Sequence, residues 1–136
     1  MPLTSRQIMA KTPLGRRQAA DYVRIMALKS KRTKAGTVII YAKTKSTSSS
    51  TGVPKVGPLN TYVSTIEVLN TRGHVKASCS CPDFTFTWEV TLHNKGAADI
   101  EYSNGEPSDA RNPQQLPGCC KHLYALFSRL VEQGRL

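Results

Sequence analysis

Long hydrophobic runs are missing from this 136-residue chain, and aromatic residues make up only 7% of it. No stretch approaches the roughly 18 apolar residues of a membrane-spanning helix. The opening Met-Pro-Leu-Thr-Ser-Arg has no apolar segment typical of a signal peptide. The hydrophobic share of 39% lies below that of an average globular domain. We therefore expect a soluble, intracellular protein without a membrane partner, whose core occupies only part of the chain.

Acidic residues are almost absent from the first 58 positions. This segment holds twelve Lys and Arg and a single acid, Asp21, for a net charge of +11, whereas residues 59–136 carry a net charge of −1. The basic character of the chain therefore belongs to its N-terminal half. We predict two parts: a basic N-terminal arm and linker over residues 1–58, and a compact module over residues 59–136.

Cysteine is scarce, and all four cysteines fall in two short clusters, Cys79-Ser80-Cys81 and Cys119-Cys120-Lys121-His122. Disulfides are disfavoured in the reducing compartment expected for this chain. The pattern Cys-x-Cys … Cys-x-His supplies three thiolates and one imidazole, a tetrahedral ligand set for structural zinc. Cys119-x-x-His122 is an alternative for the second pair. Four ordinary buried cysteines are the remaining interpretation, which the clustering disfavours.

The second part of the chain has the pattern of an α+β module. A β-rich run at 62–69, the turn Asn70–Gly73 and a returning strand at 74–81 predict a hairpin. Residues 84–92 alternate as a strand does, but they also fit a helix, and the pattern leaves both open. Residues 94–118 form a long connection, and residues 120–133 predict a helix with one apolar face. The module would be a hairpin and a C-terminal helix joined by zinc.

The first part has the composition of an extended arm. Apolar spacing predicts one short helix at about 14–30, followed by a β-prone run at 38–41 and a Ser/Gly/Pro linker at 44–58. A helix and tail of this charge fit a surface that contacts phosphates or a protein partner, and a solvated basic tail is the alternative. The predicted binding residues are Arg16, Arg17, Arg24, Lys29, Lys31, Arg32 and Lys34.

The cysteine pattern resembles the SWIM zinc finger. The resemblance rests on Cys79-x-Cys81 … Cys120-x-His122, on Pro82-Asp83-Phe84, and on the hydrophobic residues 123–127. It implies Zn²⁺ held by Cys79, Cys81, Cys120 and His122, with Cys119 as a nearby free thiol. It also implies nucleic-acid or protein binding without catalysis. The connection between the two ligand pairs is longer than is usual in that family.

This connection is similar to that of small SWIM-bearing proteins of tailed bacteriophages, on the residues Lys95–Ala98, Tyr102–Pro107, Asn112-Pro113 and Pro117-Gly118. That similarity implies a virion component or a DNA-handling accessory. We expect a non-enzymatic adaptor of a large assembly, in the neck, tail or baseplate region of a virion assembled in the host cytoplasm. The arm would contact other protein subunits, and no small-molecule substrate is expected. The alternative is an accessory protein that binds DNA or RNA through the arm.

Overall fold

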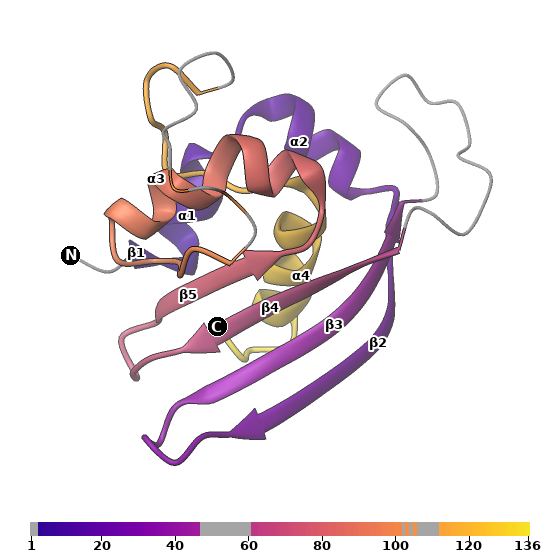
Figure 1. The fold of residues 1–136 in the computed structure, drawn as a ribbon. Helices are drawn as coiled ribbons and strands as arrows, with labels where there is room; N and C mark the ends of the chain where they lie inside the picture. Colours follow the sequence, from indigo (N-terminus) through magenta and orange to yellow (C-terminus); the bar gives the residue numbers. More distant parts are fainter. Residues whose placement is uncertain (1–2, 47–60, 102, 104, 106–111) are drawn as a thin grey trace.

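The computed structural model describes residues 3–46, 61–101, 103, 105 and 112–136. Within these residues, five strands form one antiparallel sheet in the order β1-β5-β4-β3-β2 (Figure 1). The strands are β1 (Leu3–Thr4), β2 (Val23–Arg32), β3 (Val38–Ser46), β4 (Thr61–Val68) and β5 (His74–Cys79). The helices are α1 (Ser5–Lys11), α2 (Leu14–Ala20), the π-helical turn η2 (Phe84–Trp88), α3 (Glu89–Asn94) and α4 (Lys121–Glu132). The prediction of an α+β fold is confirmed.

Helix α4 covers one face of the sheet. It contacts β2, β3, β4 and β5, and α1 and α2 pack against it. Figure 1 shows α4 behind the strands, while no described helix lies in front of β2 and β3. Among the described residues, no helix is long and apolar enough to cross a membrane.

The predicted C-terminal helix is confirmed, and its apolar face explains its position. Leu123, Leu126, Phe127 and Leu130 are fully buried in the core. Residues spaced by three and four lie on one side of a helix, so all four meet the sheet together. Burying each such side chain contributes about 1.5–3 kcal/mol. The inward side chains of the sheet, including Ile40, complete this core.

The predicted hairpin is also confirmed. Strands β4 and β5 pair with Val68 opposite Val75 and Ser64 opposite Cys79. The turn between them contains Gly73 at a φ of 87°, a backbone conformation that glycine adopts without strain. This register places the last residue of β5, Cys79, on the face that α4 covers.

The prediction of an extended arm is wrong for residues 3–46, which supply two helices and three of the five described strands. The helix predicted at about 14–30 is confirmed only as α2, and residues 23–30 belong to strand β2 instead. β2 pairs with β3 over its whole length, with a bulge between Ile25 and Ala27, and Ile25 and Leu28 pack against the core. The apolar spacing fits a helix, but the ladder of backbone hydrogen bonds and this burial outweigh local spacing.

The predicted linker and the predicted domain boundary lie largely outside the described residues. Thr44 and Lys45 belong to β3, so the linker does not begin at residue 44. The rest of the predicted linker, from residue 47 on, and the boundary between residues 58 and 59 lie outside the described residues. The two-part division therefore stays a prediction, although one sheet includes strands from both sides of the boundary.

Residues 84–94 are helical, which answers the question that the alternating pattern left open. Phe84 and Trp88 are buried, whereas Phe86 is 57% exposed. The buried amide of Asn112 then ties the returning chain to this segment, because its Nδ2 donates to the Thr87 carbonyl at 3.2 Å. This hydrogen bond holds the C-terminal part of the connection at residues 94–118 against η2.

Candidate metal centre

The structure brings the four predicted ligand residues together where β5 ends and where η2 and α4 begin. Cys79 ends β5, Cys81 lies in the turn before η2, Cys120 is the N-cap of α4, and His122 lies in the first turn of α4. The three sulfurs and a histidine nitrogen lie within 4.8 Å of one another. We call these residues the Cys₃His cluster. All four are buried, with exposed fractions of 0–3%.

The geometry fits a tetrahedral zinc ion. With Zn–S bonds of about 2.3 Å, sulfur ligands at the corners of a tetrahedron lie about 3.8 Å apart. The separations of up to 4.8 Å allow this arrangement with small side-chain adjustments. All four cysteines of the chain are free thiols, so none is consumed by a disulfide. Three thiols and one imidazole are the donors that Zn²⁺ prefers in closed structural sites.

Neighbouring donors favour negative charge on the sulfurs. The Ser64 hydroxyl donates to Cys79 Sγ at 3.5 Å, and the backbone N–H of Phe84 donates to Cys81 Sγ at 3.4 Å. The Tyr62 ring packs edge-on against the His122 imidazole, with 4.9 Å between centroids, and so restricts its orientation. These contacts orient the ligands as the outer groups of metal sites do.

The three thiols respond differently to burial. Burial opposes ionisation of Cys79, but hydrogen bonds from Cys120, Cys81 and Ser64 bring the pKa of Cys79 well below its usual value. A hydrogen bond from Cys120 favours the Cys81 thiolate, yet contact with Cys79 and burial raise the pKa of Cys81. Burial and both neighbouring sulfurs raise the pKa of Cys120 well above that of a free thiol. A divalent cation would compensate the negative charge of three adjacent thiolates.

Cys119 faces away from the cluster. Its Sγ lies 3.5 Å from the Thr12 hydroxyl, and its backbone N–H donates to the same oxygen at 3.1 Å. Burial raises the pKa of Cys119 to about 12. The geometry therefore favours Cys120 over the alternative pair Cys119-x-x-His122.

An ion pair links the cluster to the N-terminal half of the chain. Arg16 on α2 donates to both carboxylate oxygens of Asp83, at 2.8 and 3.3 Å. Asp83 also accepts from the Thr87 hydroxyl and from the indole N–H of Trp88, each at 3.2 Å. Burial opposes ionisation of this carboxyl, but the hydrogen bonds from Arg16, Trp88 and Thr87 hold the pKa of Asp83 below its usual value. Sequence reasoning missed this pair, because 67 residues separate its members.

The predicted binding residues divide into two groups. Arg16 is held by Asp83, and Arg17 donates to the backbone carbonyls of Thr12 and Ala10, so both stabilise the fold. The other five are exposed along β2 and in the turn after it: Arg24, Lys29, Lys31, Arg32 and Lys34. Lys43 and Lys45, which sequence reasoning did not include, lie beside them on β3. The alternation of residues 38–45 was the signal that identifies these two as outward-facing.

The comparisons with known proteins agree with the cluster. Residues 65–97 and 114–130 match the family model described as the SWIM zinc finger. The two matched stretches contain all four residues of the Cys₃His cluster, and residues 98–113 between them are unmatched. No curated protein and no solved structure gives a significant match. Part of the chain is thus similar to the SWIM zinc finger, and its cluster fits Zn²⁺ binding.

Proposed function

We propose that this protein is a non-catalytic, zinc-stabilised module that binds nucleic acid through its basic strands. The zinc ligands are Cys79, Cys81, Cys120 and His122. Four side-chain ligands complete the tetrahedral shell of structural zinc, which supports a stabilising role over a catalytic one. The ion would join β5 and the following turn to the start of α4, and so hold the helix on the sheet.

One observation carries the choice of nucleic acid. Five basic residues lie on the outer face of the sheet, opposite α4; we call them the basic face: Arg24, Lys29, Lys31, Lys43 and Lys45. In the part of the chain that the structure describes, the ion pairs are Arg16–Asp83 and Lys76–Asp99, and neither involves the basic face. A cluster of uncompensated cations on adjacent strands is the electrostatic pattern of phosphate binding.

Cross-strand register shows how close these charges are. Arg24 lies directly opposite Lys45, and Ala27 lies opposite Lys43. Like charges directly opposite each other on a sheet cost stability. A chain that retains such a pair without a described counter-ion gains stability when a polyanion binds there.

A salt series on the zinc-loaded protein tests the proposal. If about five phosphates are neutralised, log K falls against log[salt] with a slope of about −3.5 to −4.5. Replacing Lys43 and Lys45 by Gln reduces that slope by about 2. Arg129→Gln with Arg135→Gln is the matched control, because both exposed arginines belong to the C-terminal segment that begins with α4. Absence of binding to DNA and RNA at low salt would refute the proposal.

The role in a tailed-phage virion is a second candidate. It rests on the resemblance of the connection between the ligand pairs, and the partners would be other protein subunits of the particle. Mass spectrometry of purified particles and of the cell lysate tests this role. Enrichment in particles supports it, and presence only in the lysate contradicts it.

A further inference from the structure

We propose that the outer face of β2, β3 and β4 binds a single strand of nucleic acid, with a base stacked on Tyr41. This inference rests on the proposed function and names the ligand and the contact surface. It is carried by the strand register, by the exposure of one aromatic ring among cations, and by the charge gradient across the face.

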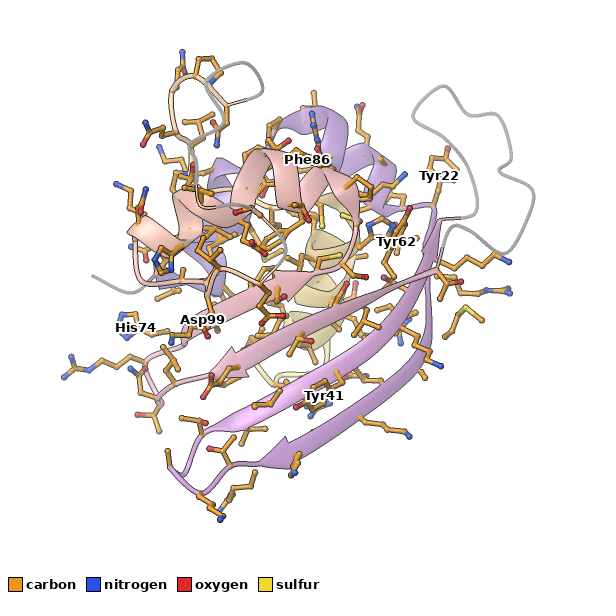
Figure 2. The ribbon with its side chains drawn as sticks, in the orientation of Figure 1. Tyr22, Tyr41, Tyr62, His74, Phe86 and Asp99 are labelled. Carbon is orange, nitrogen blue, oxygen red and sulfur yellow. The ribbon has the colours of Figure 1, made fainter. Side chains whose placement is uncertain are left out.

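The register arranges the outer face in rows. One row runs from Lys29 through Tyr41 to Thr65, and the next runs from Ala27 through Lys43 to Val63. The inward neighbours of these β3 residues are buried, so alternation turns Tyr41 and Lys43 outward. Figure 2 shows Tyr41 on the open face of the sheet, at the middle of β3.

Tyr41 provides an exposed ring with cations on two sides. It is 40% exposed, lies directly opposite Lys29, and precedes Lys43 by two positions on the same face. Val63, 43% exposed, adds an apolar surface diagonal to the ring. An aromatic face beside positive charges is what stacking on a base next to its phosphate requires.

A groove continues this surface toward β5. It measures about 390 Å³ and is lined by Tyr41, Val63, Thr65 and Ser78, among others. It also carries three acids, Glu67 on β4 and Asp99 and Glu101 in the segment after α3, and Asp99 pairs with Lys76 at 3.2 Å. The acids would repel phosphate there. The phosphates are therefore directed to β2 and β3, and the bases toward Tyr41 and the groove.

The shape of the face favours a single strand over a duplex. A duplex keeps its bases stacked inside, so an aromatic ring on a sheet has no base face to contact. Base edges in a major groove are usually reached by a helix or a two-stranded ribbon. The longest described helix, α4, buries its apolar face against the sheet, and β2 and β3 continue into β4 as part of a wider sheet, so they are not a free two-stranded ribbon. The rows from Lys45 to Ile39 span about 20 Å along β3.

The test measures fluorescence anisotropy of a labelled oligothymidylate and of a duplex of equal length. About 12 nucleotides suffice, because single-strand sites on sheet-based domains cover about 4–16 nucleotides. The zinc-loaded protein should bind the single strand more tightly. Tyr41→Ala should weaken that binding about 5- to 150-fold, the range for loss of one stacking ring. Tyr41→Phe retains the ring and should bind as the unchanged protein does.

Charge variants locate the phosphates. Lys29→Gln with Lys43→Gln should lower the salt slope by about 2, while Arg129→Gln with Arg135→Gln should leave it unchanged. Circular dichroism and zinc content verify that each variant is folded.

The outcomes separate this inference from the proposed function. Equal or tighter binding of the duplex, with Tyr41→Ala unaffected, would overturn the single-strand site and leave nucleic-acid binding standing. No binding to either probe at low salt would overturn both. Displacement of the oligonucleotide by an equal charge concentration of poly-glutamate would show that the face binds any acidic polymer, and would also overturn the inference.

Discussion

Removing the carboxylate of Asp83 tests whether the N-terminal half belongs to the same folded unit as the metal centre. Asp83→Ala removes the acceptor for three donors from two parts of the chain: Arg16 on α2, and Thr87 and Trp88 on η2. Trp88 and Thr87 are buried, with exposed fractions of 2% and 3%. Their donors would lose their acceptor, and because the Asp83 side chain is 30% exposed, water could replace it only in part.

The magnitude follows from the exposure of each partner. The side chains of Arg16 and Asp83 are 41% and 30% exposed, so their ion pair contributes only about 0.5–1 kcal/mol. Each buried donor left without an acceptor costs about 1–3 kcal/mol, and partial access of water places both near the lower end. We expect Asp83→Ala to lower the free energy of unfolding by about 2–4 kcal/mol. Asp83→Asn keeps one carbonyl oxygen and should cost about half of that.

Urea unfolding in saturating zinc, followed by circular dichroism and by Trp88 fluorescence, measures this free energy. Arg16→Gln should cost about 0.5–1 kcal/mol, and the double variant should show a coupling of the same size. A cost below about 0.5 kcal/mol for Asp83→Ala is typical of surface substitutions, and with zero coupling it would refute a docked α2.

Three further predictions concern the cluster and two buried residues outside it. Cys119→Ser should retain one zinc per chain and Cys120→Ser should lose it, because of these two residues only Cys120 belongs to the cluster. Inductively coupled plasma mass spectrometry measures the zinc content of both variants, and zinc loss restricted to Cys119→Ser would reverse the assignment. Gly118→Ala should lower the Tm by several degrees, because the added Cβ would lie 2.9 Å from the backbone oxygen of Lys11 and overpacking of this kind costs about 1–3 kcal/mol. An unchanged Tm would show that the backbones of Gly118 and Lys11 are not in contact. Glu89→Gln should lower the free energy of unfolding by about 1–3 kcal/mol without changing the zinc content, because this buried carboxylate accepts backbone N–H groups after α3 at 3.2 and 2.9 Å. A loss of zinc in this variant would instead link Glu89 to the metal.

The sequence predicts the site better than it predicts the fold around it. Cys79 and Cys81 follow a recognisable hairpin, and Cys120 and His122 begin a helix with a clear apolar face, so local patterns are enough to bring the four together. Strand β2 was missed because its inward residues, such as Leu28, pack against a core shared with α4, about a hundred positions later. Local spacing carries no information about a contact at that distance.

Charge was located correctly in sequence but not in space. Counting charges assigned the basic residues to the N-terminal half, yet Arg17 turned out to bind backbone carbonyls, and Lys43 and Lys45 were left out. The difference arises because one strand alternates between a buried and an exposed face. Only the register with β2 shows that these lysines share a surface with Lys29.

The central claim is that one zinc ion holds the β4–β5 hairpin, the turn that contains Cys81, and α4 as a single folded unit. Thermal unfolding with and without a zinc chelator, combined with zinc content, tests it most directly. A ligand present at a thousandfold its Kd contributes about 4 kcal/mol, and each kcal/mol corresponds to about 2–8 °C in Tm. We predict one zinc per chain and a Tm at least about 8 °C lower after chelation, with the same loss in Cys79→Ser. A zinc-free protein whose Tm is unchanged by chelator or by Cys79→Ser would contradict the account.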